Sequence, residues 1–206
     1  MRTLPDNGQS TLFDLLSANI RKRVQITDKE FNRATAFFTP KKIRKKQFLV
    51  QNGEVCNAIA FVTSGCLRSY TVDEHGEEHV LQFAIEDWWI SDLHSFLTGR
   101  PSDSSIDALE DSEILLLERS SREELLAAIP KFERFFRLLL EGNYVATNQR
   151  IVCSMSASAE ERYLSFLKAF PTMAQRVPQN QIASYLGIAP ESLSRVRKHL
   201  ATAHGR

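Results

Sequence analysis

The sequence predicts an α+β fold in which N-terminal helices precede an antiparallel double-stranded β-roll of the jelly-roll kind, and further helices follow it. Three features predict this fold: helix-start signals, a central stretch of short apolar runs between turn residues, and a long segment without proline. The chain has 206 residues, and 43% of them are hydrophobic, which suffices for a packed core. This composition excludes intrinsic disorder and a small disulfide scaffold.

Two helices are expected before the β-roll. A short one covers residues 12 to about 23, and the next begins at the capping box Thr27-Asp28-Lys29-Glu30. Pro40 is expected to end this second helix. Its apolar residues lie on one helical face: Phe31, Ala34, Phe37 and Phe38.

Short strands are expected between Lys41 and Glu118, because apolar runs of about four to six residues alternate there with turn residues. The turns contain Asn52-Gly53, Ser64-Gly65, Asp73-Glu74-His75-Gly76 and Glu86-Asp87. The expected strands cover residues 48–50, 58–62, 67–72, 80–84 and 114–117. This spacing is typical of an antiparallel roll or sandwich.

A short helix and a long one are expected after the roll. The short helix begins at a second capping box, Ser121-Arg122-Glu123-Glu124, and ends at Pro130, and the long one runs from Lys131 to about Ser156. Apolar or small residues recur along the long helix at intervals of three and four, which suits packing either on its own domain or on a second copy. The stripe consists of Phe135, Leu138, Gly142, Val145, Gln149 and Val152.

A helix-turn-helix is expected near the C-terminus, after a third capping box at Ser158-Ala159-Glu160-Glu161. Gly187 stands where the turn requires a left-handed residue, and Pro190 stands in the first turn of the second helix, where a missing amide costs nothing. The inward residues of the two helices are Ile182, Leu186, Leu193 and Val196.

The charge of the chain is unevenly distributed. The whole sequence has a formal net charge of +1, but residues 160–206 hold seven Lys and Arg against three Glu, which makes this segment +4. The second helix of the motif has a polar outward face, formed by Glu191, Ser192, Ser194, Arg195, Arg197 and Lys198. Such a face suits the major groove of DNA, whereas an ordinary helical hairpin that binds protein is the competing interpretation.

The order of these parts resembles the Crp/Fnr family of bacterial transcription regulators over roughly residues 25 to 200. The family's recognition pattern Arg-Glu-x-x-x-Arg is matched by Pro190-Glu191-Ser192-Leu193-Ser194-Arg195, without the first arginine. The resemblance implies a cyclic-nucleotide-binding-like sensor at 1–130, a dimerisation helix at 131–158 and a DNA-binding domain at 159–206. It implies a homodimer on a near-palindromic double-stranded operator and leaves RNA polymerase open as a further partner.

Six residues are expected to contact DNA. Arg195 can donate two hydrogen bonds to guanine, and Glu191 can accept one from cytosine. Ser192 and Ser194 are candidates for base or phosphate contacts, Gln181 for a phosphate, and Lys198 for binding that is independent of sequence. Only six residues follow Leu200, so the wing of the family is expected to be reduced or absent.

The residues that would bind a cyclic nucleotide depart from the family pattern. Ser91-Asp92-Leu93 stands in place of Gly-Glu-Leu, and Ser102 stands where an arginine would hold the phosphate, with Arg100 displaced by two positions. Trp88 and Trp89 adjoin this predicted pocket, although at most one of two adjacent strand residues can line it. We therefore expect no response to cyclic AMP or cyclic GMP, and the effector remains unknown.

Other classes of protein are disfavoured. The three cysteines are too scattered for a zinc or iron–sulfur site, so neither a metal nor a cofactor is expected, and a reduced cytoplasmic protein without membrane segments is the simplest interpretation. His75 and His79 flank a predicted hairpin and are expected to be exposed rather than haem ligands. A cupin enzyme would need a His-x-His motif, which the sequence lacks.

Overall fold

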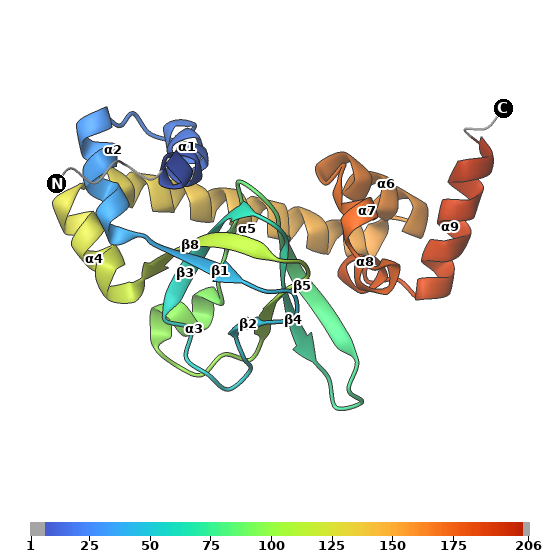
Figure 1. The fold of residues 1–206 in the computed structure, drawn as a ribbon. Helices are drawn as coiled ribbons and strands as arrows, with labels where there is room; N and C mark the ends of the chain where they lie inside the picture. The colour runs from blue at the N-terminus through green and yellow to red at the C-terminus, as the bar shows by residue number, and fades with distance from the viewer. Residues whose placement is uncertain (1–6, 204–206) are drawn as a thin grey trace. The chain divides into compact units, whose positions relative to one another are not determined.

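The computed structural model describes residues 7–203, and within it the chain forms two compact units. The first unit contains the residues up to Ser69 together with Gln82–Glu141, and the second contains Tyr70–Leu81 and the residues from Gly142 onward. The fold is α+β, as predicted, and along the chain the strands of the β-roll follow α1 and α2 and precede α4 to α9 (Figure 1).

The helices are α1 (Asn7–Arg21), α2 (Asp28–Ala34), the 3-10 helix η1 (Thr35–Phe37), α3 (Leu93–Thr98), α4 (Arg119–Ala128), α5 (Lys131–Ser156), α6 (Ala159–Ala169), α7 (Met173–Arg176), α8 (Gln179–Leu186) and α9 (Pro190–Ala203). The strands are β1 (Thr39–Ile43), β2 (Phe48–Val50), β3 (Ala58–Ser64), β4 (Leu67–Val72), β5 (Glu78–Ala84), β6 (Trp89–Ile90), β7 (Ser105–Ala108) and β8 (Ser112–Glu118). No helix in this described range is long and apolar enough to cross a membrane.

The strands form two four-stranded sheets, in the orders β1-β8-β3-β6 and β2-β7-β4-β5. In the first sheet, β8 lies between β1 and β3 and is antiparallel to both. Gly65, between β3 and β4, has φ +98°, and a Cβ atom there would lie 2.1 Å from the hydroxyl of Ser112 on β8. Only glycine fits this turn, because the backbone is left-handed and lies directly against the neighbouring strand.

An aromatic cluster forms the core of the first unit. The Trp89 ring lies 5.0 Å from Phe61 of β3, and 5.8 and 6.0 Å from Phe135 and Phe136 in the first turns of α5. The indole N–H of Trp89 donates to the side-chain oxygen of Asn19 on α1 at 3.1 Å. The cluster joins the sheet to the N-terminal end of α5, so Trp89 belongs to the core rather than to a ligand pocket.

The capping boxes at Thr27 and Ser158 are confirmed. The hydroxyl of Thr27 accepts from the amide of Glu30, whose carboxylate accepts from the amide of Thr27 at 2.9 Å. Ser158 and Glu161 repeat this arrangement at the start of α6. The expected capping box at Ser121 is wrong, because α4 begins two residues earlier, at Arg119, and its N-cap residue, Glu118, provides no side-chain cap.

Two further differences concern the β-roll. The helix that begins after Thr27 does not extend to Pro40, because it ends at Ala34 and η1 leads into β1, which contains Pro40. The strands β1, β6 and β7 were not predicted, whereas the five predicted strands are present. β1 lies at the edge of its sheet, where a proline without an N–H is tolerated.

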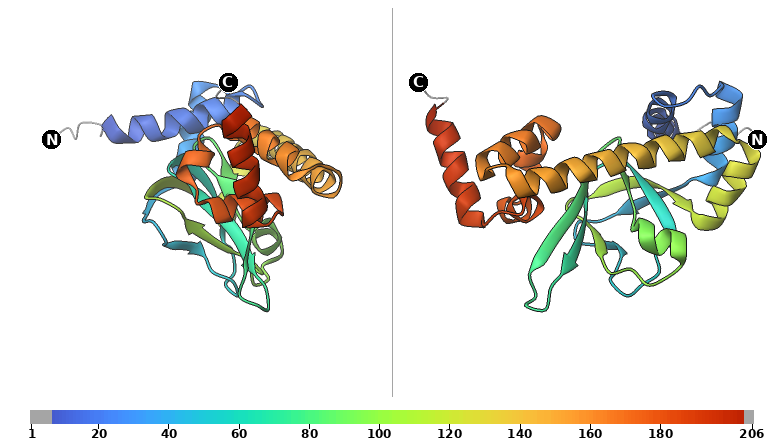
Figure 2. Two further views of the ribbon diagram at one scale, coloured as in Figure 1. Left: turned by 90° about the vertical axis from the view of Figure 1, so that its right-hand side faces the viewer. Right: turned by 180° about the vertical axis from the view of Figure 1, so that it is seen from behind.

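The second unit holds a separate small core. Helices α6 to α8 lie beside the C-terminal end of α5, and α9 packs against α6 and α8 (Figure 2). The core side chains of these helices and of the turns that follow α6 and α7 are buried: Tyr163, Phe166, Phe170, Met173, Val177, Ile182, Ala183, Leu186 and Leu193.

Candidate nucleic-acid interface and sensor pocket

Helices α8 and α9 form the predicted helix-turn-helix. Gly187 follows α8 with φ +63°, in the left-handed conformation. Its amide donates to the carbonyl of Ser184 at 3.0 Å, and the amide of Ile188 donates to the carbonyl of Ala183 at 3.1 Å. These two bonds are a Schellman motif, which ends the first helix and directs the chain toward Pro190, the first residue of α9.

The outward face of α9 is polar and cationic, as expected. Its exposed residues are Glu191, Ser194, Arg195, Arg197 and Lys198, whereas Ser192 is partly buried. The guanidinium of Arg195 donates to the hydroxyl of Ser192 at 3.2 Å, which holds it along the helix surface. Leu193 on the opposite face is 1% exposed and anchors the helix to the core of the unit. The chain thus presents base-reading side chain types at the start of α9 with cations behind them.

Gln181 lies in the first turn of α8, at the position expected to meet a phosphate. Its side chain is partly buried, and its carbonyl oxygen is buried without a hydrogen-bond partner among the described residues. The helix begins after Pro178, which provides no side-chain cap. A phosphate contact by Gln181 therefore stays a prediction.

Tyr185 and Ser184, which the sequence analysis did not single out, hold α8 in place within the second unit through their side chains. The Arg150 guanidinium of α5 lies 4.7 Å from the centre of the Tyr185 ring. Burial raises the pKa of Tyr185, and the positive charge of Arg150 opposes that change. On the same helix, the Ser184 hydroxyl accepts from the amide of Val80 at 2.9 Å and donates to the carbonyl of Glu78 at 2.8 Å.

Asp92 is the centre of the predicted sensor pocket, and its carboxylate is fully engaged. One oxygen caps α3 by accepting from the amide of Ser95 at 2.9 Å, and the other accepts from the hydroxyls of Ser102 and Ser104. Burial raises the pKa of Asp92, but the hydrogen bonds from Ser102, Ser95 and Ser104 outweigh burial and lower it overall. The carboxylate is thus held ionised, and its oxygens are engaged by groups of the protein itself.

The other predicted pocket residues do not complete a phosphate site. Ser102 is 1% exposed, its hydroxyl donates to Asp92, and the carbonyl oxygen of Ser104 lies 2.7 Å from the same hydroxyl. Arg100 is exposed, and its carbonyl accepts from the hydroxyl of Ser95. Trp88 is 38% exposed, while Trp89 lies in the core. The structure brings Asp92 and Ser102 together, and their mutual hydrogen bond occupies both.

An ion pair inside the β-roll was not foreseen. Arg68 of β4 donates to both carboxylate oxygens of Asp107 on β7, at 2.8 and 3.1 Å, and both side chains are about 90% or more buried. In the sequence, Arg68 and Asp107 each stand as a charged residue within a run of apolar or small residues. Because they are 39 residues apart, no local pattern indicates that they form a pair. This bidentate pair links two neighbouring strands of the second sheet.

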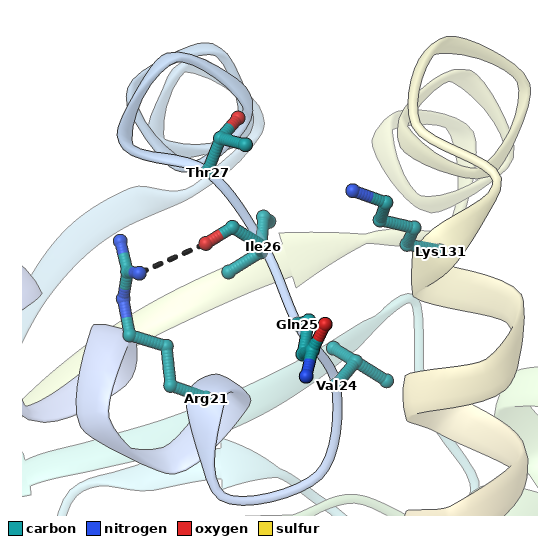
Figure 3. Close-up of a pocket in the computed structure, with 6 residues that line it drawn as sticks. All are labelled: Arg21, Val24, Gln25, Ile26, Thr27 and Lys131. Atoms are coloured by element: carbon teal, nitrogen blue, oxygen red, sulfur yellow. Dashed lines mark hydrogen bonds between the residues drawn. The ribbon is translucent and has the colours of Figure 1, made fainter.

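A surface pocket of about 350 Å³ lies between the end of α1 and the start of α5 (Figure 3). Arg21 and Lys131 line it, but both cations already have acidic partners. Arg21 donates to Asp28 and to the carbonyl of Ile26, and Lys131 pairs with Glu30 at 2.9 Å. The hydrogen bonds from Lys131 and Thr27 lower the pKa of Glu30 to about 2. The pocket therefore offers no unpaired charge to a ligand.

The hairpin between β4 and β5 brings Asp73, Glu77 and His79 together, with ligand-type atoms within 4.8 Å of one another. Asp73 accepts from the amides of His75 and Glu77 and contacts the ring of His79 at 2.8 Å. The contact with His79 is the main cause that lowers the pKa of Asp73. These bonds stabilise the turn, and both histidines are exposed as expected.

The fold and these sites define a class of protein: a β-roll of the cyclic-nucleotide-binding type joined to a helix-turn-helix. The family model described as "Cyclic nucleotide-binding domain" matches residues 40–128. The fumarate and nitrate reduction regulatory protein of Vibrio cholerae serotype O1 is 27% identical over 169 residues, which cover 76% of this chain and 66% of that protein.

Solved structures show the same architecture over most of the chain. FixK2 from Bradyrhizobium japonicum has a TM-score of 0.72 at 21% identity and covers 81% of this chain and 86% of its own. The catabolite activator protein of Thermus thermophilus has a TM-score of 0.56 at 20% identity, with coverages of 87% and 85%. Together these findings show that the chain contains a cyclic-nucleotide-binding-type domain and is similar in sequence and fold to transcription regulators of the Crp/Fnr family. The chain spans about two thirds of the length of the curated relatives.

Proposed function

We propose that this chain is a sequence-specific DNA-binding transcription regulator of the Crp/Fnr type that acts in the cytoplasm as a homodimer. One observation carries the proposal: α9 presents exposed Glu191, Ser194, Arg195, Arg197 and Lys198 on a buried helix-turn-helix scaffold. Cations on such a face contact phosphates, and Arg and Glu near the start of the helix can read base edges. RNA polymerase is a further partner that the family suggests.

The second half of α5 supports the homodimer. Its first half is buried in the first unit through Phe132, Phe135 and Phe136, and Leu138 packs against the same core. The residues from Glu141 to Gln149 are all exposed. Large apolar side chains remain exposed on the later turns: Tyr144, Val145, Ile151, Val152 and Met155. An apolar helix surface of this length is typical of an interface, and we propose that the second copy covers Val145, Gln149 and Val152.

We further propose that the chain does not respond to cyclic AMP or cyclic GMP. Ser102 stands where an arginine would hold the phosphate, and the hydroxyls of Ser102 and Ser104 are already hydrogen-bonded to Asp92. A bound phosphate would have to displace these hydrogen bonds, and no arginine occupies position 102 to compensate its charge. The effector that the β-roll senses, if it senses one, is of another chemical class.

Substitution of Arg195 and Lys198 tests the DNA-reading face. We expect Arg195→Ala to lose about 1–3 kcal/mol of discrimination at one base pair of each half-site, because a bidentate contact to guanine is removed. Lys198→Ala should weaken binding to operator and scrambled duplexes by the same factor, because a phosphate contact carries no sequence information. Fluorescence anisotropy titrations at fixed salt measure both effects.

The competing interpretation is that the helix-turn-helix binds protein. In that case wild-type protein would bind operator and scrambled duplexes alike, and its affinity for DNA would respond weakly to salt. Equal losses on both duplexes for Arg195→Ala would remove Arg195 from the base-reading role.

Calorimetric titration tests the proposed insensitivity to cyclic nucleotides. We expect no saturable heat with cyclic AMP or cyclic GMP at millimolar concentration. The variant Ser102→Arg, which restores a cation at that position, serves as a comparison for the phosphate site. A micromolar isotherm with wild-type protein would contradict the proposal.

A further inference from the structure

The side chain of Arg162 contacts the ends of two helices in the second unit. It lies in the first turn of α6, its side chain is partly buried, and its guanidinium donates to four main-chain carbonyls. Nε donates to Ala157 at 2.9 Å and Nη2 to Ser154 at 2.6 Å. Nη1 lies 3.3 Å from the carbonyl oxygen of Leu186 and 3.4 Å from that of Gly187. One side chain thus contacts the end of α5 and the turn of the helix-turn-helix.

The carbonyl of Ser154 is available because of the capping box. In a continuing helix it would accept from the amide of residue 158, four residues on. That amide donates instead to the carboxylate of Glu161 at 2.8 Å, so α5 ends and the Ser154 carbonyl is left without its helical partner. Arg162 takes the place of that partner.

The carbonyls at the end of α8 are available for a related reason. The amides of Gly187 and Ile188 turn back to Ser184 and Ala183, which leaves the carbonyls of Leu186 and Gly187 beyond the last turn. The C-terminal ends of helices carry partial negative charge, and a cation placed there is favoured. The guanidinium of Arg162 meets two such ends at once.

We infer that Arg162 is a positioning residue that sets the angle between the dimerisation helix α5 and the helix-turn-helix, and thereby the half-site spacing that the dimer accepts. The inference rests on the proposed function, because the angle matters only if α9 enters DNA. A planar guanidinium with donors in fixed directions can hold two helix ends in one orientation, whereas an ammonium acts as a point charge. The direct chain connection is only Ala157-Ser158, so Arg162 supplies the lateral constraint.

Binding to duplexes of different spacing is the first test. A duplex selected by the wild-type protein is altered by one or two base pairs between its half-sites, each base pair being about 3.4 Å along the axis. We expect wild-type protein to lose about tenfold or more in affinity at the altered spacings. Arg162→Gln should reduce that preference to about threefold or less while its affinity for a single half-site changes by less than about twofold. Arg162→Lys should retain part of the preference, since it can still contact one of the two helix ends.

Lys168→Gln is the matched control, because Lys168 is exposed on the last turn of the same helix and its loss removes the same charge. This variant should keep the wild-type spacing preference. An unchanged spacing preference in Arg162→Gln, with or without a lower melting temperature, would reduce Arg162 to a structural role and overturn the inference.

A second measurement does not need DNA. Spin labels at Thr147→Cys on α5 and Ala201→Cys on α9, both exposed positions, report the distance between the two helices in a Cys153→Ser background diluted with unlabelled protein. We expect the distance distribution to broaden in Arg162→Gln and not in Lys168→Gln. An equally narrow distribution in Arg162→Gln would overturn the inference. If wild-type protein selects no operator, the proposed function fails, and the spin-label result still decides whether Arg162 fixes the angle.

Discussion

Arg68 and Asp107 place a complete ion pair inside the β-roll, with side chains 7% and 10% exposed. Two charges at such depth lose their hydration, and the two hydrogen bonds between them compensate for part of that loss. Removal of one partner is therefore expected to lower the free energy of unfolding strongly. Replacement of both partners by an apolar pair of the same volume need not lower it.

We expect Asp107→Ala to lower the free energy of unfolding by about 3–5 kcal/mol, because it leaves the Arg68 guanidinium buried beside a cavity. Urea unfolding followed by tryptophan fluorescence measures this change. The double variant Arg68→Met with Asp107→Leu should recover most of the loss. If Asp107→Ala unfolds at the wild-type urea concentration, the pair is not isolated from water in solution.

At the scale of single residues, sequence reasoning succeeded where the interaction is local. The capping boxes at Thr27 and Ser158 were predictable because both partners lie within four residues. Arg68 and Arg162 were not, because the partner of Arg68 is 39 residues away and the partners of Arg162 are carbonyls exposed only by the way two helices end. Ser121 was assigned wrongly because the Ser-x-x-Glu pattern also occurs inside a helix that has already begun.

The apolar stripe of helix α5 could pack on its own domain or on a second copy of the chain, and the two halves of the helix differ in this respect. Phe135 is fully buried in its own unit, whereas Val145 and Val152 are 53% and 62% exposed. The change happens near Glu141, where the first unit ends. One amphipathic pattern thus serves the core of the β-roll first and, in our proposal, the second copy afterwards.

Substitution of Val152 tests the second half. We expect Val152→Glu to convert a dimer into a monomer of 23.5 kDa, because two carboxylates would face each other in a seam from which water is excluded. Sedimentation equilibrium or light scattering measures the mass. Asn143→Glu, a change of an exposed residue on the opposite side of the same helix, should leave the mass unchanged. A dimer that survives Val152→Glu would place the interface elsewhere.

The missed strands show the limit of apolar patterning. β1 contains Pro40 and two lysines, and four of its five residues are exposed, so it has no apolar run to detect. It exists because β8 provides a partner along its whole length. β7 contains a buried aspartate, whose place in a strand depends on Arg68 from the neighbouring β4.

On the scale of the whole molecule, near-neutrality conceals two opposite charges. The formal net charge is +1, of which residues 160–206 hold +4 and the preceding residues −3. The positive part includes the exposed face of α9, so the attraction to phosphates is concentrated in the helix-turn-helix. The fold class and this division were predictable from the sequence, because both depend on patterns repeated over many residues. The sensor pocket, in which Asp92 accepts hydrogen bonds from Ser102 and Ser104, was predictable only in part, because the sequence singled out Asp92 and Ser102 but not Ser104.

Selection of bound duplexes from a random pool tests the central claim most directly. A homodimer that reads DNA with α9 should enrich a near-palindrome whose two half-sites have centres about one helical turn, or about 34 Å, apart. Arg195→Ala should enrich the same spacing with one base pair relaxed in each half-site. A pool that shows no enrichment, or a single motif without an inverted repeat, would contradict the account.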